Sequence, residues 1–92
     1  MSAGVINIGF GNYVVKDKIV AIVSADSAPV RRAIQEARRV GQLVDATHGR
    51  RTRSVIFTDS RQIVVSGLNQ ETLVRRLDDG GAAADTGNGD AG

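Results

Sequence analysis

The most concentrated chemistry in the sequence lies in one short segment, residues 48–53, with the sequence His-Gly-Arg-Arg-Thr-Arg. It holds three guanidinium groups and one imidazole within six residues. Cations this close repel one another, and arriving phosphate groups offset that cost most readily. We therefore predict an anion-binding loop. A solvated basic connection, or arginines paired with acidic residues of a neighbouring subunit, would give the same composition.

Other kinds of site have little support in the residues. With no cysteine and a single histidine, the chain lacks the ligands for an ordinary zinc or catalytic metal centre, so we expect no metal and no cofactor. Gly9 and Gly11 are similar to the start of a dinucleotide fingerprint, but Val14 occupies the place of its third glycine. Asp45 and His48 could orient a serine, but no nucleophile-elbow sequence accompanies them. We expect a protein that is not an enzyme.

Charge is divided unevenly along the chain. Residues 1–77 hold all 12 Lys and Arg residues and six of the ten acidic residues, a balance of +6, whereas residues 78–92 carry −4. Ten of the cations are arginines, whose planar fork matches phosphate geometry, so the basic part favours a polyanionic partner. The only aromatic residues are Phe10, Tyr13 and Phe57, too few for the stacking platforms of RNA and single-strand binders. Contact with the backbone of duplex DNA fits better.

Length and composition predict one domain and a tail. Ninety-two residues suffice for a single core, which we place in residues 1–77. From Gly80 onward no aliphatic residue is larger than Ala, so we predict that residues 78–92 form a disordered acidic tail, which competes for the basic surface or aids solubility. No apolar run approaches the roughly 20 residues of a spanning helix, and the N-terminus lacks the basic region of a signal peptide. We expect a soluble cytoplasmic protein without membrane contact.

Alternating strand and helix periods predict the elements that position the basic loop. Gly9 and Gly11, with Asn12, supply positive φ for a turn or bulge between the first two apolar segments. The expected strands lie at residues 5–8, 13–15, 19–23, 43–47, 55–58 and 63–66. Residues 59–61 join the last two as a hairpin. The first two segments form a hairpin or one bent strand, so we expect about five strands.

Two helices complete the prediction. The first opens at Ser27 or Ala28, with Pro29 in its first turn, where the missing N–H is harmless, and Gly41 just past its end. One of its faces is apolar and the opposite face is basic, the latter with Arg31, Arg32, Gln35, Arg38 and Arg39. The second runs from an Asn69 N-cap to about Leu77. The fold class is α+β, with a small, mostly antiparallel sheet, one amphipathic helix and a short C-terminal helix.

Several ordered blocks of this sequence resemble one known family. They are residues 6–12, 22–24, 27–29, 34–37 and, above all, 45–53. At near-identical spacing they resemble the RemA-like family of bacterial extracellular matrix regulators over roughly residues 4–77. The resemblance implies a small α/β protomer that assembles into a homo-oligomeric ring and binds double-stranded DNA. It further implies regulation of genes for biofilm matrix and osmotic adaptation.

The resemblance also implies roles for individual residues. Arg50 and Arg51 stand where the family's paired arginines are associated with DNA binding. Lys18 occupies a place where the family often has Arg, which keeps the charge but loses bidentate phosphate geometry. His48 stands at a place that varies between aliphatic and aromatic types. The candidate DNA contacts are therefore Arg50, Arg51, Arg53, Lys18 and His48, and the candidate structural residues are Gly9, Gly11, Pro29 and Gly49.

The expected function is that of an oligomeric transcriptional regulator that binds duplex DNA. Oligomerisation suits the size, because a domain of about 77 residues buries only around 60% of its chain surface and gains from subunit contacts. Two alternatives stay open. One is a ring-forming scaffold whose basic surface recruits an acidic protein partner, and the other is an RNA-binding module.

Overall fold

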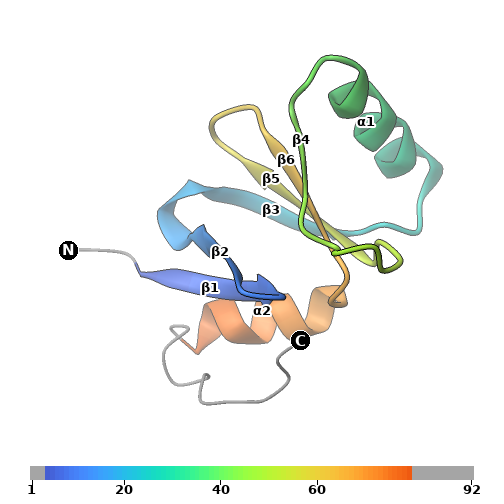
Figure 1. The fold of residues 1–92 in the computed structure, drawn as a ribbon. Coiled ribbons are helices and arrows are strands. Elements are labelled where there is room, and N and C mark those ends of the chain that lie inside the picture. The colour runs from blue at the N-terminus through green and yellow to red at the C-terminus, as the bar shows by residue number, and fades with distance from the viewer. Residues whose placement is uncertain (1–3, 80–92) are drawn as a thin grey trace.

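The computed structural model describes residues 4–79, and these form an α+β fold (Figure 1). The α+β class predicted from the sequence is confirmed. In chain order the elements are β1 (Val5–Gly9), β2 (Asn12–Val15), the 3-10 turn η1 (Lys16–Lys18), β3 (Ile19–Ser24), α1 (Ala28–Arg39), β4 (Leu43–Asp45), β5 (Ser54–Thr58), β6 (Ile63–Ser66) and α2 (Gln70–Asp78).

The strands form two sheets, so the prediction of one sheet of about five strands is wrong in number and arrangement. β1 and β2 pair as a separate antiparallel hairpin, and the other four strands form a sheet in the order β3-β5-β6-β4. In the larger sheet β5 runs antiparallel to both neighbours, but β4 runs parallel to β6. The cause is α1, because this helix connects β3 to β4 as a crossover and so returns β4 in the same direction as β3.

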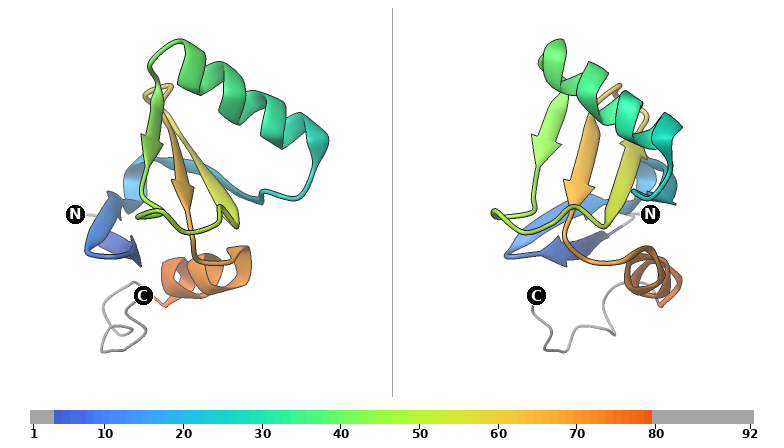
Figure 2. Two further views of the ribbon diagram at one scale, coloured as in Figure 1. Left: turned by 45° about the vertical axis from the view of Figure 1, so that its right-hand side comes forward. Right: turned by 90° about the vertical axis from the view of Figure 1, so that its right-hand side faces the viewer.

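Both faces of the four-stranded sheet are covered (Figure 2). Val55 and Val65 pack toward α1, in a cluster that includes Ile34 of that helix. Their neighbours Ile56 and Val64 point to the opposite face, where β1 and α2 complete the other cluster. Burial on both sides explains why β5 and β6 are continuous apolar runs rather than alternating ones.

The helix boundaries confirm the predicted caps. The Ser27 side chain accepts a hydrogen bond from the Val30 N–H at 3.3 Å, Pro29 lies in the first turn of α1, and Gly41 has φ +78°. Asn69 caps α2 by accepting from the Thr72 N–H at 2.9 Å. α2 extends through Asp78, one residue past the predicted domain boundary. Of the predicted disordered tail, residues 78–92, the part from residue 80 onward lies outside the described residues.

The β1–β2 hairpin turns through three consecutive residues with positive φ. Gly9, Phe10 and Gly11 have φ of +110°, +55° and +76°, and the register of the pairing shifts between Asn7 and Gly9. The predicted turn is confirmed, but Asn12 does not take a positive φ; its side-chain amide donates to the Gly9 carbonyl at 3.0 Å. Since a strand and not a helix follows, no dinucleotide-binding turn forms here.

One buried serine joins the hairpin to the larger sheet. Ser66 Oγ donates to the Ile8 carbonyl at 2.8 Å and accepts from the Leu68 N–H at 3.0 Å. Arg76 of α2 adds a second link by donating from Nη1 to the Asn7 carbonyl at 2.8 Å. These bonds hold the Gly9–Gly11 turn in a fixed place at one end of the sheet. Within residues 4–79 neither helix is long and apolar enough to cross a membrane.

Candidate nucleic-acid interface

The basic segment between β4 and β5, residues 48–53, is called here the arginine loop. The backbone on both sides of it is held by β6: the Ala46 N–H donates to the Val65 carbonyl, and the Arg53 N–H donates to the Ser66 carbonyl, each at 2.9 Å. Between these attachments the side chains of Arg50, Arg51 and Arg53 are exposed. The loop therefore combines a fixed backbone with guanidinium groups that reach solvent.

Asp45 sets the first bend before the arginine loop. Its Oδ1 accepts from the Thr47 N–H at 2.9 Å and from Thr47 Oγ1 at 2.6 Å. This turn ends β4 at Asp45, so the predicted continuation of the strand to residue 47 is wrong. The Thr47 carbonyl then accepts from the Arg50 N–H at 3.0 Å, and His48 and Gly49 turn the chain with φ of +57° and +83°. Gly49 therefore takes a left-handed conformation that favours glycine.

The hydrogen bonds from Thr47, the side-chain bond above all, lower the pKa of Asp45 from its ordinary value. A carboxylate whose pKa falls on folding adds stability above its unfolded pKa, and that stability disappears as the pH falls through the folded pKa. We expect wild type to be more stable than Asp45→Asn at neutral pH, and the difference to shrink below about pH 4, the range of an unperturbed Asp. Chemical unfolding of both proteins across this range measures it.

Asp17→Asn is the matched control, because the structure records no hydrogen bond to the side chain of this exposed residue of η1 within residues 4–79. It should show little pH-dependent difference from wild type. A stability difference for Asp45→Asn that stays constant between neutral and acid pH would contradict the role given to this carboxylate.

Phe10 connects the hairpin turn to the arginine loop. The His48 ring stacks on Phe10 with 4.8 Å between centroids and 13° between planes. Arg50 Cζ lies 5.2 Å from the centroid of the same ring, a cation–π distance. Sequence reasoning missed Phe10 as a functional residue. Its one local signal is a bulky residue between two turn glycines, where the structure gives it a positive φ that such residues rarely adopt.

The structure does not bring all predicted DNA contacts together. His48, Arg50, Arg51 and Arg53 share one loop, but Lys18 lies elsewhere. The Lys18 carbonyl accepts from the Asp59 N–H, just past the last residue of β5, whereas Arg53 directly precedes the first. The five residues of β5, at about 3.3 Å each, therefore separate Lys18 from the arginine loop within one protomer.

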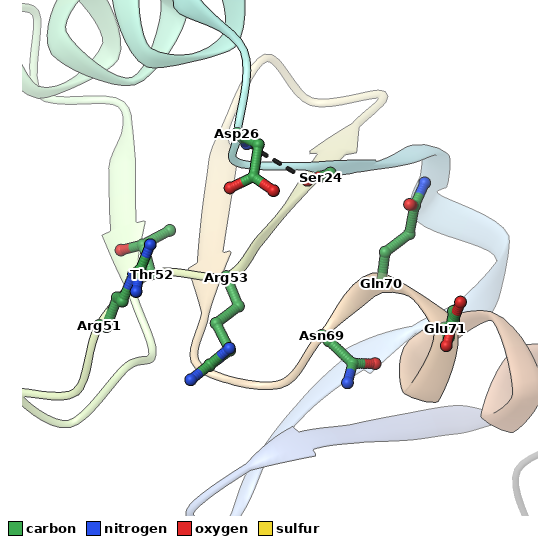
Figure 3. A pocket seen from close by; sticks show the side chains of 8 residues that line it. All are labelled: Ser24, Asp26, Arg51, Thr52, Arg53, Asn69, Gln70 and Glu71. Atoms are coloured by element: carbon green, nitrogen blue, oxygen red, sulfur yellow. Dashed lines mark hydrogen bonds between the residues drawn. The ribbon is translucent and has the colours of Figure 1, made fainter.

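The guanidinium groups of the arginine loop form no ion pair with any residue of the described range, 4–79. Across residues 4–79 the one ion pair is Arg39 with Glu36, on α1. A cleft of about 350 Å³ separates the loop from the start of α2; Asp26 and Glu71 also line it (Figure 3). In that view the Arg53 side chain points away from the Asp26 carboxylate. Within residues 4–79 no three His, Cys, Asp or Glu side chains are grouped so that they could hold a metal ion.

A second cleft lies between the arginine loop and the hairpin turn. It has a volume of about 280 Å³, and Phe10, Arg50, Arg51, Arg53 and Leu68 are among the residues that line it. Its cationic side chains come from the loop, and its apolar wall comes from the turn and the approach to α2. Such a cleft suits an anion that accepts hydrogen bonds from several arginines on one wall.

Fold and site together define a small mixed α+β protein with a fixed, arginine-rich loop at one end of its sheet. Residues 5–77 match the model of the RemA-like family, described as extracellular matrix regulatory protein A-like. The chain therefore belongs to this family, and the resemblance seen in the sequence is confirmed.

Individual relatives carry names that agree with a regulatory family. The chain is 54% identical over 77 residues to a protein of Halothermothrix orenii, and the aligned region covers 84% of this chain and 92% of the relative. It is 57% identical over 77 residues to a protein of Clostridium perfringens (84% and 86% covered) and 58% identical over 77 residues to one of Alkaliphilus metalliredigens (84% and 83% covered). Each is named "Putative regulatory protein".

Proposed function

We propose that this protein is a cytoplasmic, non-enzymatic regulator that binds the phosphate backbone of duplex DNA as a homo-oligomeric ring. In keeping with its family, it would act on genes for biofilm matrix and osmotic adaptation. The observation that carries the proposal is the arginine loop, whose three exposed guanidinium groups form no ion pair within residues 4–79. Free guanidinium groups on a fixed backbone are ready to form charge-assisted contacts with phosphate.

The surroundings of the loop favour backbone contact over base reading. Phe10 and His48 stack on each other, so one face of each ring is already covered and the pair offers little surface as a platform for successive unpaired bases. The loop is also neither a helix nor a two-stranded ribbon, the elements that enter the major groove. A short loop with several arginines instead fits along a phosphate chain.

Assembly into a ring would multiply these contacts. Several large apolar side chains are exposed on the protomer, among them Tyr13, Val15 and Val44, which line a common cleft of about 300 Å³. Covering such side chains is a usual role of subunit contacts. In a ring, each additional arginine loop meets the same duplex at high effective concentration, so weak single contacts add up to firm binding.

The proposal predicts binding that weakens steeply with salt. Each neutralised phosphate contributes about −0.9 to the slope of log affinity against log salt, so one loop with three arginines gives no more than about −2.7. We expect a steeper slope, because several protomers act together. Retardation of labelled duplex between about 50 and about 300 mM salt measures it, with light scattering on the same samples to confirm a particle larger than a dimer.

RNA and heparin in the same assay distinguish the alternatives. Tighter binding of duplex DNA than of either polyanion supports the proposal. Preference for RNA would indicate the RNA-binding module instead. Affinity for duplex that does not change with salt, or no affinity at all, would contradict backbone binding and favour a scaffold for an acidic protein.

A further inference from the structure

A third cleft, between α1 and the arginine loop, carries positive charge from both elements. It has a volume of about 370 Å³, and Arg31 and Arg38 of α1 line it together with Arg51 and Thr52 of the loop. Arg51 and Thr52 also line the neighbouring cleft shown in Figure 3. The two clefts therefore adjoin at Arg51 and Thr52, and the basic lining continues from the loop onto the helix.

Helix geometry explains why only some arginines of α1 reach this cleft. Seven residues make nearly two turns at 3.6 residues per turn, so Arg31 and Arg38 lie on the same flank, about 10.5 Å apart along the axis. Gln35 lies between them and also lines the cleft. Arg32 is turned by about 100° from Arg31 and is not among the lining residues. The sequence placed all four arginines of α1 on one basic face, but in the structure only Arg31 and Arg38 line the cleft.

The charge of the cleft suits an anion. Three guanidinium groups face one carboxylate, that of Asp26. None of the four groups forms an ion pair within residues 4–79, where Arg39–Glu36 is the one such pair. Ala25 and Ile34 supply an apolar floor, which excludes water from one side and so strengthens charge-assisted contacts.

We propose that the cleft between α1 and the arginine loop is a second phosphate site, which holds backbone phosphates of the same duplex that the loop binds. The inference rests on the proposed function and extends it to a new contact surface. Phosphates of one strand follow each other at about 3.4 Å along the duplex axis. For a duplex whose axis runs parallel to α1, the separation of Arg31 and Arg38 corresponds to about three nucleotides, and Arg51 connects this stretch to the phosphates at the arginine loop.

Asp26 has a distinct part in this arrangement. Its carboxylate projects from the connection between β3 and α1 (Figure 3), and it lines two of the three clefts that Arg51 lines. A carboxylate beside a bound phosphate repels it. Asp26 therefore lowers the affinity of the site, and its removal should strengthen binding rather than weaken it.

The test compares two double variants that remove the same charge. Arg31→Gln with Arg38→Gln removes both helix arginines of the cleft, and Arg32→Gln with Arg75→Gln removes two exposed arginines outside it. For the cleft variant we expect duplex affinity to fall at least about tenfold and the salt slope to become shallower by about 1.8 for each protomer engaged. For the control we expect duplex affinity to fall by less than about threefold, because the variant loses only the long-range attraction of two positive charges.

Asp26→Asn provides a gain-of-binding measurement that does not depend on a weakened protein. Its side chain accepts no hydrogen bond recorded within residues 4–79, so the fold should be kept, as circular dichroism would verify. Duplex affinity should rise several-fold. In the Arg31→Gln/Arg38→Gln background the rise should disappear, because no phosphate then enters the cleft.

Each outcome decides between defined cases. If wild type fails to bind duplex, or Arg50→Ala and Arg51→Ala bind normally, the proposed function itself is wrong. If those two variants lose binding while the helix variant matches its charge control and Asp26→Asn gains nothing, only the second phosphate site is wrong. Titration with pyrophosphate serves as the last arm: tight binding that requires Arg31 and Arg38, with duplex affinity unaffected by them, would overturn the duplex assignment in favour of a small phosphate ligand.

Discussion

Replacement of Arg50 or Arg51 by Ala should sharply weaken binding to duplex DNA and leave the fold intact. A charge-assisted hydrogen bond contributes about 1.5 to 3 kcal/mol, which corresponds to roughly a tenfold to hundredfold loss for one contact. The loss recurs in every protomer that touches the duplex, so the measured defect should exceed that of one site. Both side chains are exposed, and Arg50 gives up only its contact with Phe10, worth about 0.5 to 1 kcal/mol at an exposed site.

Arg75→Ala is the control for this experiment, since it removes an exposed arginine of α2 outside the arginine loop. It should bind duplex nearly as well as wild type. Retardation, light scattering and circular dichroism on the same samples separate loss of DNA contact from loss of assembly. An Arg50→Ala protein that dissociates into monomers would move this arginine from the DNA contact to a subunit interface. Normal retardation by both arginine variants would favour the scaffold alternative.

Leu73→Ala should cause a large loss of stability. Leu73 of α2 is 0% exposed and belongs to the cluster that joins Ile6 and Ile8 of β1 to Ile56 of β5. Truncation of a fully buried leucine costs about 2 to 5 kcal/mol, because it removes buried apolar surface and leaves a cavity. A domain of this size is usually stable by only about 5 to 15 kcal/mol. Urea unfolding followed by circular dichroism measures the change.

Val74→Ala is a control at the adjacent position. Its side chain is 40% exposed, so its truncation should cost below about 1 kcal/mol. Wild type and variants must be compared at equal protein concentration, because assembly would add to the apparent stability. A cost for Leu73→Ala no larger than that for Val74→Ala would mean that α2 and the hairpin do not share one core with the sheet.

Signals confined to a few neighbouring residues predicted most of the elements. Ser27, Pro29 and Gly41 mark the start and end of α1 because capping and backbone freedom act within one turn of the helix. The glycines around Phe10 likewise predict the hairpin turn. The exposed arginine loop could also be anticipated, since charge density needs no knowledge of the fold.

What the sequence could not show depends on contacts between distant segments. Nothing near Leu43 indicates that β4 pairs parallel to β6, because the crossover through α1 decides that direction. The stacking of His48 on Phe10 joins residues from two different turns. Periodicity gives the angle between Arg31 and Arg32 on α1, but it does not say which flank of the helix faces the loop.

Hydrogen bonds between the β1 strand and the segment from β6 to α2 determine when this protein can finish folding. The bond from Ser66 to Ile8 connects residues 58 positions apart, and the bond from Arg76 to Asn7 connects residues 69 positions apart. During synthesis the hairpin emerges well before β6 and α2, which cover it, are made. Its apolar side chains stay uncovered until then, and long-range closure of this kind slows folding. The arginine loop is attached to β6 by backbone hydrogen bonds, and its His48 stacks on Phe10 of the hairpin. It therefore acquires its final shape only when β6 and the hairpin come together.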